Sequence, residues 1–354
     1  NEGGVAANSV ASGVAIVQLN SQFINWTGGA LTILDPHANT TASNTLAFNN
    51  STAHVNVPNT HTLKLGDGVS TDAGGNATNG FRLSTFVGSR RISFGNLEVN
   101  TTGGTNRQVT TASNIGFNGN VTIEPSSEVV FGTSYVAGNI VNNGTFTSTA
   151  VLGLASYTDG TVSATTNAQT IGGTGVYRNS AATPTASLTS LTVNNTNATG
   201  VTLNIPLSVS GTLTMTSGII NTTNTNLLTL GTATAAGILA GTPSATNMVR
   251  GPFARTIANA NANTNYLLFP VGKTTYAPIW AAPATTAVSV MKAETFDTNT
   301  GTQSAAIANM ATNRRWELPL VSGTITDINV RVGDAGILAT SIPVQAPSAS
   351  AEYT

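Results

Sequence analysis

The sequence predicts an all-β protein: a parallel β-helix (a β-solenoid) followed by a smaller antiparallel β-sandwich-like domain. Three observations predict this fold class. The chain has 60 Thr and 39 Asn among its 354 residues, but only 13 basic and 14 acidic residues. Thr and Asn are weak helix formers. Short segments alternate apolar with polar residues, and such segments return roughly every 20 residues, a spacing typical of solenoids.

The composition excludes several classes of protein. The chain has no cysteine, which excludes a disulfide scaffold, an iron–sulfur cluster and a thiolate metal site. A net charge of −1 offers no electrostatic footprint for nucleic acid, and no apolar run reaches the roughly 18 residues of a membrane helix. Hydrophobic residues make up 40% of the chain, too many for a disordered protein. We therefore expect no nucleic-acid partner and no membrane span.

Five short segments carry the repeat, at residues 95–100, 119–124, 138–143, 189–194 and 211–216. The first three begin with Gly-Asn at positions 95, 119 and 138, which are 24 and 19 residues apart. Each segment alternates apolar residues with Thr, Asn or Glu, the period of a strand with one buried face. No helical pattern separates the segments, which argues against a βαβ architecture.

The composition favours stacked coils over the alternative, an antiparallel sandwich or barrel. Stacking places equivalent residues about 4.8 Å apart. We expect Asn ladders to bond amide to amide and Thr ladders to pack in register, whereas ladders of like charge would repel. The predicted inward-facing apolar residues are Ile115, Phe117, Val121, Ile123, Phe131, Ile140, Phe146, Leu191, Val193, Leu203, Leu207, Leu213, Met215, Ile220, Leu228 and Leu230.

The amino-acid composition of the chain changes near residue 250. Proline becomes frequent from Pro243 onward, and two of the three tryptophans, Trp280 and Trp316, follow. Proline is confined to the edges and turns of sheets. We therefore assign residues 1–250 to the β-helix and 251–354 to the sandwich-like domain. We expect the chain to be part of a longer protein and the sandwich-like domain to be cut short at its end.

Several motifs recur in order between residues 165 and 320. They are 169–175 followed by 188–194, then 211–221, 226–231, 248–257 (Met-Val-Arg-Gly-Pro-Phe-Ala-Arg-Thr-Ile), 268–273 (Leu-Phe-Pro-Val-Gly-Lys) and 276–278 (Tyr-Ala-Pro). This stretch resembles the large, repetitive, gliding-adhesin-like surface proteins of Bacteroidota that the type IX system exports. The resemblance implies an extracellular or cell-surface, filament-forming β-rich protein without catalysis. Ala254 departs from the Thr or Leu that the family often has nearby.

Metal sites have two candidates. The histidines His37, His54 and His61 all fall near the start of the chain, and a metal site needs two or three ligands that converge. Solvated strand histidines are far commoner, so we expect none. Asp67, Asp72 and Asn76 form a weak calcium candidate, because calcium takes six to eight oxygen ligands. The loop lacks the spacing and the terminal Glu of a calcium helix-loop-helix, so we interpret it as a Gly-rich surface loop and expect no cofactor.

Catalytic candidates are equally weak. Glu124 and Glu128 flank Pro125, whereas glycosidases need two carboxylates facing one cleft, so we interpret the pair as a solvated turn. The segment 172–175 lacks the lysine and the helix of a phosphate loop, and we interpret it as a turn as well. We therefore expect no catalytic and no cofactor-binding residues.

Two basic doublets stand out, at 90–91 and 314–315, and Trp316 follows the second. Arginine beside an aromatic ring can bind glycans, but such a cluster more often caps the edge of a domain.

The sequence thus favours a non-catalytic extracellular structural or adhesive protein, a solenoid that forms rods or filaments. Its partners would be further copies of itself, stacked end to end, or glycans and surfaces. Two alternatives stay open: an enzyme that acts on polysaccharides, and a carbohydrate- or ice-binding module that uses the threonines Thr212, Thr214 and Thr216.

Overall fold

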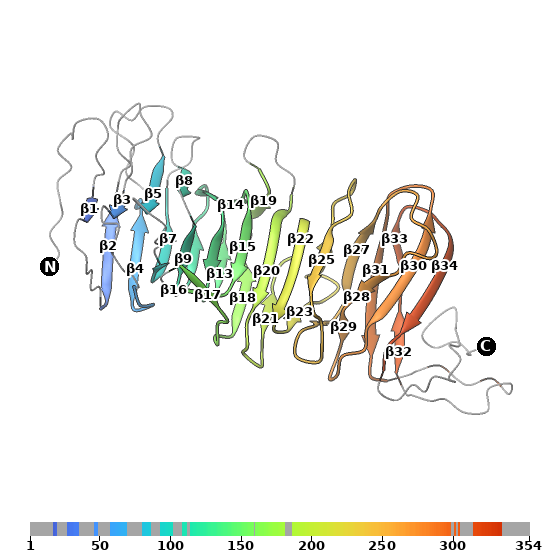
Figure 1. Cartoon of the computed structure of the whole chain (residues 1–354). Helices are drawn as coiled ribbons and strands as arrows, with labels where there is room; N and C mark the ends of the chain where they lie inside the picture. The colour runs from blue at the N-terminus through green and yellow to red at the C-terminus, as the bar shows by residue number, and fades with distance from the viewer. Residues whose placement is uncertain are drawn as a thin grey trace. The chain divides into compact units, whose positions relative to one another are not determined.

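The computed structural model confirms the predicted fold class: a parallel β-helix with smaller antiparallel sheets after it (Figure 1). It describes residues 17–19, 27–34, 46–48, 57–68, 80–85, 93–101, 108–111, 114–158, 160–180, 186–298, 301, 304 and 314–334. Within these ranges every regular element is a strand. No helix in this part of the chain is long and apolar enough to cross a membrane.

The chain forms two compact units, which meet at Ile205 and Pro206 and are described separately. The sequence places its division later, between residues 250 and 251. The first unit is built of three parallel sheets, called faces 1, 2 and 3 here.

Face 1 consists of β1 (Val17–Leu19), β3 (Leu46–Phe48), β5 (Phe81–Thr85), β8 (Gln108–Thr111), β11 (Glu128–Phe131), β14 (Thr145–Ser148) and β19 (Val176–Arg178). Face 2 consists of β6 (Ser93–Phe94), β9 (Ile115–Phe117), β12 (Ser134–Val136), β15 (Val151–Leu154) and β20 (Leu188–Asn194). Face 3 consists of β2 (Gly29–Ile33), β4 (His61–Leu65), β7 (Asn96–Val99), β10 (Val121–Ile123), β13 (Ile140–Asn142), β18 (Gln169–Gly172) and β21 (Val201–Leu203).

From β5 onward, each coil of the first unit visits faces 1, 2 and 3 in turn, as β11, β12 and β13 do. The Gly-Asn repeat sets the register on face 3, where Leu97 pairs with Val121 and Val121 with Ile140. The predicted spacings of 24 and 19 residues are therefore coil lengths. The next coil is longer because it carries an antiparallel hairpin, β16 (Ser156–Thr158) and β17 (Thr161–Ser163).

The core lies between the faces, and every inward-facing apolar residue predicted from the sequence is buried. Aromatic rings continue from coil to coil along it. Centroid distances run from 6.2 Å (Phe94 to Phe117) through 5.8 Å (Phe117 to Phe131) and 5.7 Å (Phe131 to Phe146) to 5.5 Å (Phe146 to Tyr177). These separations lie in the range in which aromatic pairs stabilise each other beyond simple burial.

The outward rows differ from the expected ladders of identical residues. On face 3 one row runs Lys64, Glu98, Thr122 and Val141. Lys64 and Glu98 form an ion pair of 2.8 Å between neighbouring coils. The stack thus admits charges where opposite signs are adjacent, because only like charges in register repel.

The second unit has the following strands: β22 (Leu207–Ser217), β23 (Ile220–Asn221), β24 (Leu228–Leu230), β25 (Ile238–Gly241), β26 (Val249–Arg250), β27 (Phe253–Ile257), β28 (Leu267–Phe269), β29 (Val271–Gly272), β30 (Ile279–Thr285), β31 (Ser289–Phe296), β32 (Arg315–Glu317), β33 (Leu320–Ser322) and β34 (Ile325–Val332). Parallel pairing joins β22 to β24 and β25, β24 to β27, and β23 to β26 and then β29. Antiparallel pairing joins β31 to β27, β32 and β33. In a separate sheet it joins β30 to β28 and to β34.

Parallel pairing therefore extends to Gly272, beyond the predicted division of the chain. Two of the prolines that suggested a change of fold, Pro252 and Pro270, lie between these strands and take part in the coils. The Pro252 carbonyl accepts a hydrogen bond from Thr222 Oγ1 (2.7 Å), and the Pro270 carbonyl accepts one from the Val249 amide (2.8 Å). A coil of a β-helix tolerates proline at a corner, where no strand partner needs its missing N–H.

Glycine at one corner allows the coils to approach closely. Gly119 and Gly138 stack in neighbouring coils, and the Gly138 amide donates to the Gly119 carbonyl (3.1 Å). A Cβ on Gly138 would lie 2.5 Å from the Gly119 carbonyl carbon, whereas a Cβ on Gly132 would meet nothing within 4 Å.

We expect Gly138→Ala to lower the free energy of unfolding by about 1–3 kcal/mol, the usual cost of overpacking. Gly132→Ala is the matched control, because it changes the entropy of the unfolded chain equally. Chemical denaturation of both variants and the parent measures the difference. Equal stability of the two variants would show that the coils at Gly138 can move apart at little cost.

Candidate functional site

A row of three asparagines follows the corner between faces 2 and 3, and we call Asn96, Asn120 and Asn139 the asparagine corner. The Asn120 amide donates to Asn96 Oδ1 and the Asn139 amide to Asn120 Oδ1, each at 2.8 Å. In the next coil the Thr170 amide (2.8 Å) and hydroxyl (3.1 Å) donate to Asn139 Oδ1. The expected amide-to-amide ladder is thus wrong here: each side chain accepts from the backbone of the next coil.

This bonding follows from the geometry of a corner. Backbone N–H groups between two strands have no ladder partner, yet they still require an acceptor. Asparagine carries an acceptor on a short side chain that readily bonds nearby backbone. Because one coil stacks on another, the Asn of one coil stands directly beside the N–H of the next.

Two asparagine side chains, those of Asn96 and Asn118, also donate hydrogen bonds through Nδ2 to backbone carbonyls of an earlier coil. Asn96 Nδ2 donates to the carbonyls of Asn59 (2.6 Å) and His61 (3.2 Å). Asn118 Nδ2 donates to the Val57 carbonyl at 2.9 Å. These bonds fix the corner to the segment from Val57 to His61, the first residue of β4.

Side chains also replace backbone partners where the hairpin interrupts the coil. Gln169 is buried, and its Nε2 donates to the carbonyls of Val136 and Gly138, both at 2.9 Å. The Ala137 carbonyl accepts from Thr165 Oγ1 (3.1 Å) and Asn167 Nδ2 (3.0 Å). Residues that follow the inserted hairpin therefore bond three carbonyls of the preceding coil.

The corner borders a shallow hollow of about 410 Å³ that has no charged residue in its lining. We call it the asparagine hollow. Six asparagines line it, namely Asn59, Asn96, Asn118, Asn120, Asn139 and Asn167. A concave site whose polar groups are held in fixed positions is the usual starting point for a binding hypothesis.

A second hollow, of about 460 Å³, lies at the corner between faces 3 and 1. Glu128 and Asn143 are among its lining residues. Asn143 Oδ1 accepts from the Thr174 amide at 3.2 Å, the bond that recurs along the asparagine corner. Glu128 Oε2 accepts from Gln108 Nε2 at 2.7 Å.

Only part of the predicted metal candidates lies in the described residues. Asp67 follows β4 and is exposed, whereas Asp72 and Asn76 lie outside the described residues, as do His37 and His54. His61 opens β4 and is buried, and burial lowers the pKa of its imidazole. Within the described ranges no three His, Asp or Glu side chains gather into a metal-binding group.

The catalytic candidates lie on either side of a turn, as the sequence predicts: Glu124 precedes it and Glu128 opens β11. The Glu124 carbonyl accepts from the Ser127 amide (3.1 Å), and Ser126 between them has a φ of 66°. Of the two glutamates, only Glu128 lines the hollow beside this turn. Gly172 ends β18 and Gly173 turns with a φ of 111°, so the segment 172–175 also forms a turn.

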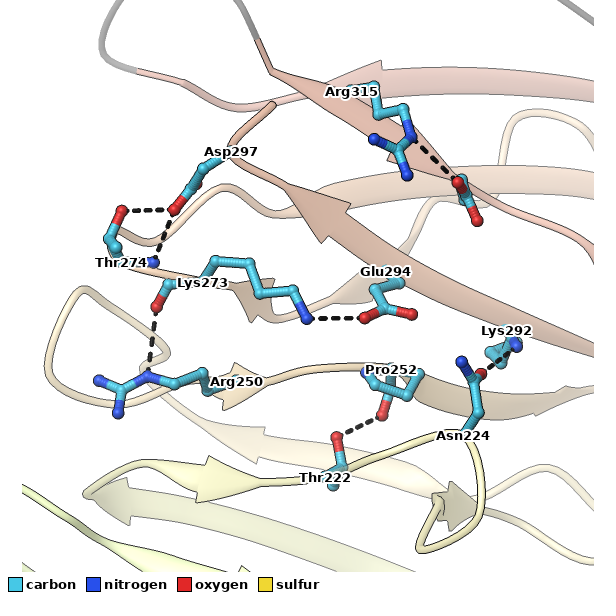
Figure 2. Close-up of polar contacts among 11 residues, drawn as sticks. Thr222, Asn224, Arg250, Pro252, Lys273, Thr274, Lys292, Glu294, Asp297 and Arg315 are labelled. Carbon is cyan, nitrogen blue, oxygen red and sulfur yellow. Dashed lines mark hydrogen bonds and ion pairs between the residues drawn. The ribbon is translucent and has the colours of Figure 1, made fainter. Parts of the chain in front are cut away.

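Charged side chains are engaged with one another in the second unit (Figure 2). Lys273 Nζ donates to Glu294 Oε1 at 2.7 Å, and the Lys273 carbonyl accepts from Arg250 Nε at 3.2 Å. Asp297 Oδ2 accepts from the hydroxyl (2.6 Å) and the amide (3.1 Å) of Thr274. Burial raises the pKa of Asp297, but these bonds and the charges of Arg314 and Lys273 outweigh it and hold that pKa below 3.8.

The doublet Arg314-Arg315 makes contacts within the second unit. Arg314 pairs with Asp334 (2.9 Å) and Asp297 (3.2 Å). The Arg315 guanidinium lies 3.9 Å from the centre of the Phe296 ring, and Trp316 Nε1 donates to the Ala277 carbonyl at 3.0 Å. The first doublet, at residues 90 and 91, lies outside the described residues.

The threonines suggested for ice or carbohydrate binding lie on β22. Thr212 and Thr214 pair with Ile238 and Ala240 of β25, so the row of threonines does not continue into that strand. A flat threonine array would require the same residue in neighbouring coils.

The sequence did not predict the asparagine hollow, although its Gly-Asn repeat marks the positions of the asparagine corner. The Gly-Asn starts at 95, 119 and 138 mark three of its coils. Asn59, Asn118 and Asn167 stand outside that repeat, and only the stacking of coils brings them to the same hollow.

Comparison of the chain with known proteins finds no match among family models, curated proteins or solved structures.

We expect the stability of the protein to fall as the pH drops below 6.5, in part because of His61. Burial lowers the pKa of the folded imidazole below its ordinary value of 6.5, so the unfolded chain binds the proton first. His61→Gln should therefore reduce the loss of stability on acidification. Thermal melts of the parent and the variant above and below pH 6.5 test this, and parallel pH dependences would contradict it.

Proposed function

We propose that this protein is a non-catalytic structural or adhesive protein of the cell surface, a β-solenoid that forms rods or filaments. The observation that carries the proposal is the coil-on-coil bonding of the first unit. Three parallel faces stack in register, and uncharged side chains join the corners. This architecture gives a stiff scaffold whose length grows with the number of coils.

The low charge of the chain supports self-association. The sequence carries 27 charged residues in 354, and a net charge of −1 gives little repulsion between copies. An end coil of any β-helix offers unpaired N–H and C=O groups that template a further strand. Copies that stack end to end would pair those groups.

The motifs that resemble Bacteroidota surface adhesins are spread over the strands of the second unit and the end of the first. The run 211–216 lies on β22, 248–257 spans β26 and β27, and 268–273 spans β28 and β29. The resemblance of these motifs supports the extracellular location in the same proposal.

The alternative is a solenoid that binds or degrades polysaccharide. The asparagine hollow favours the binding version, because it is concave, polar and free of charged lining residues. For degradation the chain offers Glu124 and Glu128, of which Glu128 lines the second hollow.

We expect purified protein to form linear assemblies that sediment faster as the protein concentration rises. Because few charges are available, the assemblies should survive transfer from low salt to about 1 M salt, where the Debye length is about 3 Å. Negative-stain electron microscopy and analytical ultracentrifugation measure this. Monodisperse monomers at every concentration, without adhesion of protein-coated beads to cells or surfaces, would contradict the proposal.

We expect incubation with neutral and acidic polysaccharides to release no new sugar ends or unsaturated products. Glu124→Gln and Glu128→Gln should then behave like the parent in adhesion and assembly. Product release that is lost in either variant would replace the structural function with an enzymatic one.

A further inference from the structure

The asparagine hollow is lined in part by side-chain amides in which one polar atom is fixed by a hydrogen bond and, within the described residues, the other is free to bind a ligand. The Oδ1 atoms of Asn120 and Asn139 each accept from the next coil, which orients the whole side chain. Among the described residues no partner is found for Nδ2 of Asn120 or Asn139. The exposed Asn59 side chain likewise has no partner there.

Acceptors stand beside these donors. Asn167 donates through Nδ2 to the Ala137 carbonyl at 3.0 Å, which leaves its Oδ1 available. The hollow therefore offers both donors and acceptors on side chains that are held by other bonds. A hydroxyl group donates and accepts at once, so it is the group that such a surface matches.

The spacing and the floor of the hollow suit an extended ligand. Asn120 and Asn139 occupy equivalent positions in neighbouring coils, which are roughly 4.8 Å apart, the spacing of adjacent strands. Gly119 and Gly138 also line the hollow and add no side chain. A linear ligand with regularly placed hydroxyls can therefore meet the same amide at each coil.

The absence of charge in the lining selects among such ligands. A carboxylated or sulfated polymer would lose hydration at the hollow without a cation there to compensate it. A peptide offers one backbone donor and one acceptor per residue and would instead compete for strand edges.

We propose that the asparagine hollow is a binding site for a neutral glycan chain lying along the coil axis. Asn120 and Asn139 would donate to its oxygens through Nδ2, and Asn59 and Asn167 would complete the contacts. This inference rests on the adhesive function proposed above and supplies its ligand class.

The test uses Asn120→Asp/Asn139→Asp. Aspartate keeps an oxygen for the backbone amides of residue 139 and Thr170, so the hydrogen bonds between the coils remain, and it removes both free donors. Repulsion between the two new carboxylates lowers the stability of this variant. The matched control is Asn143→Asp, which changes the same kind of corner bond, to Thr174, at the other hollow. Full-length protein is titrated by calorimetry with neutral cello- and malto-hexasaccharides and with an acidic hexuronate oligomer.

We expect the parent and Asn143→Asp to bind a neutral oligosaccharide equally, and the double variant to bind it at least tenfold more weakly, with all three melting cooperatively. Asn59→Ala, which removes no bond of the coil stack, should also weaken binding and covers the case in which the double variant misfolds. Binding of the acidic oligomer alone, equal binding by all variants, or no glycan binding by the parent would overturn the inference. If filaments or adhesion persist in the last case, the structural function stands without this site.

Discussion

Backbone hydrogen bonding between successive coils is the constraint on which the first unit depends. Within the faces, the backbone N–H and C=O groups of neighbouring parallel strands bond one another. At the corners the chain leaves the strands, and its backbone groups lose these partners. Asn96, Asn120 and Asn139 supply the missing acceptor at one corner and Asn143 does so at another. Asparagine at these corners therefore supplies acceptors for backbone amides that the strand ladders leave unbonded.

The same bonding fixes the side chains that face solvent. An amide whose oxygen is held by the next coil loses little further freedom when its nitrogen binds a ligand, so a corner built for stability is also preorganised for recognition. The core contributes separately, through the aromatic row from Phe94 to Tyr177, and the hairpin of β16 and β17 packs Tyr157 against Tyr135 at 4.8 Å.

In the second unit the chain passes from parallel to antiparallel pairing, and charge takes a larger part in its packing. Arg255 on β27 is buried, donates to the Leu268 carbonyl at 2.7 Å, and has its pKa lowered by burial to about 10. Phe296 on β31 has cations near its ring from Lys273 and Arg315, at 5.3 and 3.9 Å. Among the described residues, every contact of a cation with an aromatic ring lies in the second unit.

The sequence by itself determined the strand class, the buried faces and the coil spacing at 95, 119 and 138, because alternation and repetition are local patterns that each coil repeats. It could not determine where the parallel pairing ends, since proline is as compatible with a coil corner as with a sandwich edge. Nor could it foresee that Asn bonds the backbone of the next coil, or that Asn59, Asn118 and Asn167 share one hollow. Those features depend on coil lengths, which on face 3 vary from 19 to 34 residues and which only stacking in three dimensions resolves.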